Sequence, residues 1–135
     1  MLAAAKLGEP GARNNVGYMY DTGVGVRSSR EAALHWYRRA YRQGNPCAAS
    51  NIGTIFRDEK DFDRALHWFQ RTVRLNGGDD GDADLEIAQI YLRHSGDFAK
   101  AVHHLKRACR SKHVTQHGLE QAKRLLNRTE RKLNR

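Results

Sequence analysis

The 135-residue sequence predicts an all-α fold, an alpha-alpha superhelix (a short α-solenoid) of about three helical hairpins with a C-terminal capping helix. A set of small and aromatic residues returns with a period of roughly 36 residues, which is typical of stacked helical repeats. Within each copy, apolar residues recur at every third or fourth position, as on one face of a helix. Only two prolines interrupt the chain. We therefore expect a single repeat domain over residues 1–135.

The first hairpin is predicted over residues 8–43. Its periodic positions are Ala12, Val16 and Tyr20 in the first helix, and Ala33, Trp36, Tyr37, Ala40 and Tyr41 in the second. Gly17 and Ala33 fall on the packing faces, where a larger side chain would hold the helix axes apart. In the linker we expect Gly23 to end the first helix and Ser28 or Ser29 to cap the second.

Two further hairpins are predicted over residues 44–76 and 77–111. The second copy carries Ala48, Asn51, Ile52, Gly53, Phe56, Ala65, Trp68, Phe69 and Thr72. The third carries Glu86, Ile87, Ala88, Tyr91, Ala101, His104, Leu105 and Ala108. Their internal linkers, residues 57–61 and 95–98, are shorter than that of the first copy and lack its Gly-Val-Gly-Val run, so the copies are related but not identical.

The two ends depart from the repeat. Residues 1–7 resemble the last turns of a second helix, which indicates either a remnant of a longer chain, with a possible end-to-end contact, or a minimal cap. Residues 112–135 predict a basic amphipathic helix that covers the third hairpin. Its apolar stripe consists of Leu119, Ala122, Leu126, Thr129 and Leu133.

These spacings, with the linker Gly23-Val24-Gly25-Val26 and the ending Trp36-Tyr37-x-x-Ala40-x-x-x-Gly44, resemble the Sel-one-like repeat, a relative of the tetratricopeptide repeat. The second and third copies are closer to the plain tetratricopeptide spacing. The resemblance implies a non-enzymatic scaffold or adaptor that holds a partner peptide or protein on the concave surface of its helices.

Two loops look like ligand sites but depart from the known patterns. The Gly23–Gly25 linker follows a helix and lacks a Gly-Lys-Ser/Thr ending, so a structural role is favoured over phosphate binding. Asp80, Asp82 and Asp84 alternate as in a calcium loop, but Leu85 replaces the turn glycine and Tyr91 the closing glutamate. We expect these carboxylates to be stabilised by the N-terminus of the following helix.

No enzyme or cofactor is predicted. Cys109, His113 and His117 have helical spacing, but a turn is expected between them, which disfavours a zinc site. Cys47 and Cys109 occupy different places in their repeats, so reduced thiols are expected. No apolar run approaches a membrane span, and the predicted location is cytoplasmic.

The positive charge, +9 formally, recurs along the predicted second helices and defines a basic band. Its members are Arg38, Arg39, Arg42, Arg71, Arg74, Lys106, Arg107 and Arg110. The band either binds an acidic surface or is a solvated face. Because such charge also attracts nucleic acid, a basic nucleic-acid-binding module is the alternative to the adaptor. His35, His67 and His103 recur beside the band and are expected to face solvent.

A partner groove is predicted on the first helices, opposite their packed stripes. Its residues are Asn14, Asn15, Tyr18, Ser50, Asn51, Thr54, Glu86, Gln89 and Arg93. Amide side chains both donate and accept hydrogen bonds, so they suit the backbone of an extended peptide. The alternative is that the asparagines bond only to water or to neighbouring loops.

Overall fold

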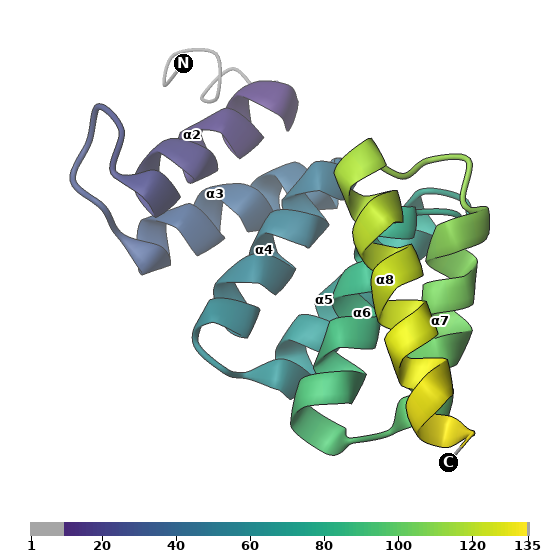
Figure 1. The fold of residues 1–135 in the computed structure, drawn as a ribbon. Coiled ribbons are helices and arrows are strands. Elements are labelled where there is room, and N and C mark those ends of the chain that lie inside the picture. Colours follow the sequence, from purple (N-terminus) through teal and green to yellow (C-terminus); the bar gives the residue numbers. More distant parts are fainter. Residues whose placement is uncertain (1–9, 135) are drawn as a thin grey trace. The chain divides into compact units, whose positions relative to one another are not determined.

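The computed structural model describes residues 10–134, with side chains from residue 13 onward. Within that range the chain is helical with short loops and contains no strand (Figure 1). The elements are α2 (Pro10–Thr22), α3 (Arg30–Arg42), α4 (Pro46–Asp58), α5 (Phe62–Leu75), α6 (Gly81–Ile90), η1 (Tyr91–Ser95), α7 (Phe98–Arg110) and α8 (Gln116–Leu133). The all-α prediction is confirmed. The predicted remnant, Met1–Leu7, lies outside the described residues.

Helices α3, α4, α6, α7 and α8 each begin after a residue whose side chain caps the first turn. The capping side chains are Ser29, Asn45, Asp80, Asp97 and Thr115, each of which accepts a backbone N–H from the first turn of its helix. The Ser29 hydroxyl oxygen accepts from Ala32 at 3.2 Å, as the sequence predicted. Gly23 follows α2 with φ of 77°, a conformation that L side chains rarely adopt, and so marks the end of that helix.

The chain forms two compact units, one up to Trp68 and the other from Phe69 onward, with the division inside α5. In the first unit, α2 packs on α3 and α3 on α4. Val16 is fully buried, with Tyr20 and Trp36 packed against it. Ala33, Ala40, Ala48 and Ile52 are also fully buried, so small side chains supply much of this core.

Gly17 allows α2 to approach α3 closely. A Cβ atom at Gly17 would lie 2.5 Å from Cδ1 of Tyr37, a side chain that is completely buried. The Tyr37 hydroxyl donates to Oδ2 of Asp21 at 3.2 Å, so the ring is fixed at both ends. Burial of the Asp21 carboxyl raises its pKa, and the hydrogen bond from Tyr37 opposes that rise. The predicted need for a small residue at Gly17 is confirmed.

In the second unit, α6, α7 and α8 share one core. It consists of Leu85, Ala88, Leu105, Ala108 and Ala122, with Cys109, Leu125 and Leu126 packed against it. The last helix therefore covers the third hairpin through its apolar stripe. The stripe ends earlier than predicted, because Leu133 is exposed.

Asp82, one of the three aspartates that resemble a calcium loop, holds the α7–α8 loop together with the preceding Asp79. Asp79 accepts hydrogen bonds from the Ser111 hydroxyl and from the Lys112 N–H, and Asp82 accepts from the N–H and the hydroxyl of Thr115. No metal-ligating cluster occurs among the residues that the structure describes. The helix-terminus interpretation is correct for Asp80, which caps α6, and incomplete for the others.

Close backbone contacts complete this junction. The Gly81 N–H donates to the His113 carbonyl at 3.0 Å, and a Cβ atom there would lie 2.5 Å from Cβ of Val114. A Cβ at Gly118 would overlap the Asp82 carboxylate. The loop also separates His113 from α7, so Cys109 and the two histidines do not share one continuous helix, as predicted. None of the described helices has the length and apolarity that a bilayer span requires.

We predict that Gly17→Ala destabilises the chain although alanine is the better helix former. The added methyl group must displace the buried Tyr37 ring, and overpacking of this kind costs about 1–3 kcal/mol. Urea unfolding followed by circular dichroism measures the change. Asn15→Ala on the same helix, at an exposed position, is the matched control and should leave the midpoint almost unchanged. Equal midpoints for both variants would contradict the close-contact explanation.

We predict that Asp79 contributes to acid sensitivity. Hydrogen bonds from Ser111 and Lys112 lower the pKa of the Asp79 carboxyl. Because the folded pKa lies below the unfolded value of about 3.9, its stabilising contribution is present above that pH and is lost as the pH falls through the folded pKa.

Asp79→Asn should therefore lower the melting temperature at neutral pH, and should narrow its gap to the wild type as the solution is acidified. Thermal melts over a pH series measure both effects. The control is Asp63→Asn, at an exposed position of α5. An Asp79→Asn curve parallel to that of the wild type at every pH would refute the assignment.

Candidate functional site

Polar residues of α2 and α4 form a shared face in the first unit. The Asn51 side-chain amide donates to Oδ1 of Asn14 at 3.2 Å, so the two helices lie side by side here. Asn15 is exposed, and 55% of the Tyr18 side chain is accessible. Ser50 and Thr54 continue the face along α4 and are half-buried. The structure thus brings one predicted groove residue of the first repeat, Asn14, into contact with one of the second, Asn51.

Part of the hydrogen-bonding capacity of this α2–α4 face is used internally. Asn14 and Asn51 bond to each other, and the Thr54 hydroxyl donates to the Ser50 carbonyl at 3.0 Å. An amide has two donors and an acceptor oxygen with two lone pairs, so each asparagine retains further capacity. Asn15 and Tyr18 are the exposed members of the face.

The predicted groove residues of the third repeat belong to the second unit. Glu86 and Gln89 are half-buried on α6, whereas Arg93 is exposed on η1. The wider π-helical turn changes the angular spacing of residues that follow Tyr91. Arg93 therefore does not lie on the helix face that regular α-helical spacing from Glu86 would give it.

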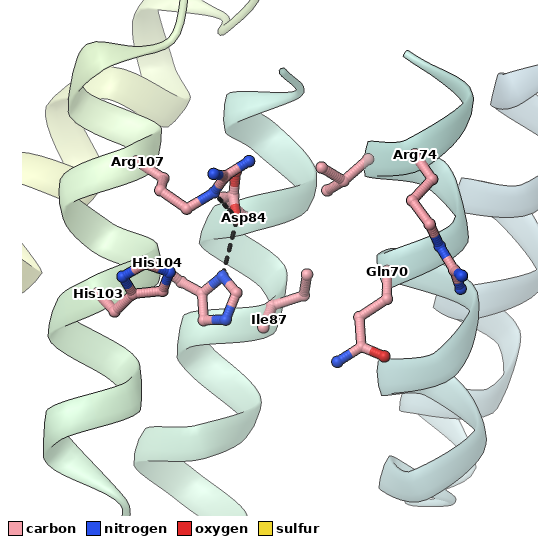
Figure 2. Close-up of a pocket in the computed structure, with 8 residues that line it drawn as sticks. Gln70, Arg74, Asp84, Ile87, His103, His104 and Arg107 are labelled. Atoms are coloured by element: carbon pink, nitrogen blue, oxygen red, sulfur yellow. Dashed lines mark hydrogen bonds and ion pairs between the residues drawn. The ribbon is translucent and has the colours of Figure 1, made fainter. Parts of the chain in front are cut away.

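A pocket of about 380 Å³ lies in the second unit among α5, α6 and α7 (Figure 2). Its lining residues are Gln70, Val73, Arg74, Asp84, Ile87, His103, His104 and Arg107. His104 and Arg107 of α7 point toward Asp84 on one side, and on the other side Gln70 extends from α5 toward α6, whereas the Arg74 guanidinium is turned away from Asp84 (Figure 2). The pocket therefore combines cationic, amide and apolar groups.

Asp84 is held by two side chains of α7. Its Oδ1 lies 2.8 Å from Nδ1 of His104, and Nε of Arg107 lies 3.3 Å from each carboxylate oxygen. The Asp84 side chain is only 3% exposed. Arg107 also donates through Nη2 to the Gly78 carbonyl, which fixes the guanidinium at a second point. Asp84, His104 and Arg107 form a polar network that connects α6 with α7.

The sequence interpretation missed this network, although the repeat register contained a signal for it. Asp84 stands where the second repeat has the buried Ala49, and His104 stands where the first two repeats have Trp36 and Trp68. An acid at a buried position, together with a histidine in place of a tryptophan, indicates a polar pair that replaces an apolar one.

The basic band is not uniform. Arg38, Arg42, Arg74, Lys106 and Arg110 are exposed, as are the neighbouring His35, His67 and His103. The Arg39 guanidinium lies 5.3 Å from the centroid of the Trp36 ring, a cation–π contact. Arg107 is bound to Asp84, and Arg71 is half-buried. Some of the predicted band therefore serves internal contacts.

Cys47 and Cys109 are free thiols. Cys109 is partly buried against the core of the second unit, and this burial raises the pKa of its thiol. Cys47 is exposed on the first turn of α4 and is not part of a core.

We predict that Asp84→Ala destabilises the second unit by about 1–3 kcal/mol, because the half-buried donors of His104 and Arg107 lose the buried carboxylate that accepts from them. Chemical unfolding followed by circular dichroism measures the loss. Asp63→Ala removes an exposed acid and should change the unfolding free energy much less. The network would have no stabilising role if the two variants unfolded alike.

Comparison with known proteins identifies the same helical repeats that the structure shows. The family model of the Sel1 repeat matches residues 10–45, 52–77 and 92–113, which together exceed half of the chain. The matches in the second and third copies are shorter, in agreement with their different linkers.

A Sel1 repeat protein from Oxalobacter formigenes has a similar solved structure. It is 26% identical, with a TM-score of 0.63, and the match covers 76% of this chain and 44% of that one. A protective antigen of uropathogenic Escherichia coli strains, which displays an SLR fold, has a TM-score of 0.67 at 23% identity over 78% of this chain and 23% of its own. At this sequence identity, the similarity to the Escherichia coli antigen is evidence for the fold alone.

A sel1-like repeat-containing protein of Acanthamoeba polyphaga mimivirus is 27% identical over 63 residues, which are 47% of this chain and 12% of that protein. The chain thus spans less than half the length of each of these relatives. The repeat register, the helical hairpins and the family match agree: this chain belongs to the Sel1 repeat family.

Proposed function

We propose that this chain acts as a non-enzymatic adaptor that binds an extended segment of a partner protein on the α2–α4 face. Sel1 repeats are generally scaffolds for protein–protein interactions and are typically not enzymes. The observation that carries the proposal is the Asn51–Asn14 hydrogen bond, which aligns two polar helix faces next to the exposed Asn15 and Tyr18.

The face suits a peptide backbone. The Asn15 amide offers both donors and an acceptor to main-chain groups, which carry no sequence information of their own. The exposed Tyr18 ring adds apolar area for one side chain, and tyrosine loses little conformational entropy on binding. Hydrogen bonds to the peptide backbone would provide affinity, and the peptide side chain that contacts Tyr18 would provide selectivity.

The exposed part of the basic band supports a preference for acidic partners. Arg38, Arg42, Arg74, Lys106 and Arg110 would attract such a partner over several ångströms, mainly by accelerating encounter. The comparisons give no support to the nucleic-acid alternative. Tyr18 is also the one exposed Phe, Trp or Tyr within residues 13–134, whereas single-stranded nucleic acid binding uses rows of stacking aromatics.

We predict that Asn15→Ala and Tyr18→Ala weaken binding without changing the melting temperature. A displayed library of random dodecapeptides is selected on the immobilised chain, and a selected peptide is synthesised and titrated by calorimetry. Each lost hydrogen bond should reduce affinity by about 0.5–1.5 kcal/mol, and loss of the Tyr18 ring should add to the effect.

The matched control is Asn127→Ala, which changes an exposed asparagine on α8 in the other unit. It should bind the selected peptide as the wild type does. If the double variant Asn15→Ala, Tyr18→Ala keeps full affinity for every selected peptide, the α2–α4 face is not the binding site.

A further inference from the structure

The pocket among α5, α6 and α7 carries a second inference. We propose that it receives the carboxylate side chain of a glutamate or aspartate in an acidic partner segment. The pocket lies in the second unit and shares no residue with the α2–α4 face, so this proposal does not rest on binding at that face.

The anion would meet donors from two helices. Arg74 is an exposed residue that lines the α5 side of the pocket, and the Gln70 amide lies one helical turn before it (Figure 2). The Arg74 guanidinium is turned away from Asp84 in the structure, so a bound carboxylate would require rotation of this long side chain (Figure 2). The exposed His103 ring lies on the α7 side. A guanidinium binds a carboxylate through two parallel hydrogen bonds, and an amide N–H adds a neutral donor. The available groups are thus suited to one carboxylate.

The acidic residue in the pocket does not oppose this ligand as strongly as its charge suggests. The Asp84 side chain is 3% exposed, and both of its oxygens already accept hydrogen bonds from α7. Arg107 supplies the compensating charge and is held in place by Asp84 and by the Gly78 carbonyl.

The remaining lining fits the aliphatic part of the ligand. Val73 is half-buried, and Ile87 is almost completely buried. The methylene groups of a glutamate side chain would pack against Val73 while the carboxylate reaches Arg74. The volume of about 380 Å³ accommodates one side chain with its neighbouring backbone.

The same geometry favours an acidic peptide over a nucleic acid. A polyanion binds through a row of cations that neutralise successive phosphates. Here Arg74 is the exposed arginine in the lining, and the adjoining surface near Arg110 contains the carboxylates of Asp79 and Asp84. Interspersed acids disfavour a continuous phosphate backbone but leave room for a single anionic side chain.

The test uses nuclear magnetic resonance of the whole ¹⁵N-labelled chain at constant ionic strength. The probes are the capped tripeptide acetyl-Gly-Glu-Gly-amide, its Gln and phosphoserine counterparts, and a single-stranded dodecathymidine. We expect the Glu peptide to shift the Gln70 side-chain amide and the backbone amides of Arg74, Ile87 and His103 in a saturable manner. The Gln peptide should not shift them.

Arg74→Gln should weaken binding of the Glu peptide by about three- to tenfold, because it removes a charge-assisted hydrogen bond at a partly solvated site. Lys106→Gln is the matched control: it removes one exposed positive charge from α7 outside the pocket lining and should keep the wild-type affinity. Circular dichroism and melting curves show whether both variants are folded.

Several outcomes would overturn the proposal. They are no saturable shift with the Glu peptide, equal shifts with the Glu and Gln peptides, or equal weakening by Arg74→Gln and Lys106→Gln. Saturable shifts with only the phosphoserine peptide would assign the pocket to phosphate instead, and shifts with only the oligonucleotide would assign it to nucleic acid. Failure here leaves the selected-peptide test of the α2–α4 face unaffected.

Discussion

Close approach of paired helices is the constraint on which the rest of this structure depends. Where α2 meets α3, the absence of a side chain at Gly17 gives room for the buried ring of Tyr37. Alanines such as Ala33, Ala40 and Ala48 are fully buried nearby and keep the separation small. Because the helices are short, each hairpin depends on such contacts more than on helix propensity. The polar face that we propose for binding lies on helices whose other faces pack in this way.

The third repeat maintains the same helix contact by a different chemistry. Where the earlier copies place tryptophan, it has His104, and the buried carboxylate of Asp84 joins that ring to Arg107. Buried ion pairs often contribute little net stability, because desolvation offsets their attraction. Their clearer effect here is geometric: Asp84 and the Gly78 carbonyl fix the orientation of Arg107, and so define one wall of the pocket.

The sequence predicted the structure correctly where the structure follows from local chemistry or from the repeat period. Ser29 and Asp80 cap helices for reasons contained in their own first turns, and Gly17 lies where the periodicity places it. The Asn14–Asn51 contact spans 37 residues, close to one period, and was within reach of the same argument. The contacts of Asp79 with Ser111 and of Asp82 with Thr115 depend on the geometry of the α7–α8 loop, which the period does not determine.

Some of the positively charged side chains make contacts within the protein, and only the others are available to a partner. The formal charge of +9 and the regular band suggest a continuous cationic surface. Arg39 contacts Trp36, however, and Arg107 neutralises a buried acid, so neither offers its full charge to a ligand. What remains exposed of the band is Arg38 and Arg42 on α3, Arg74 on α5, and Lys106 and Arg110 on α7. Because such exposed charges mainly accelerate encounter, selectivity for one acidic partner has to come from local geometry and not from net charge.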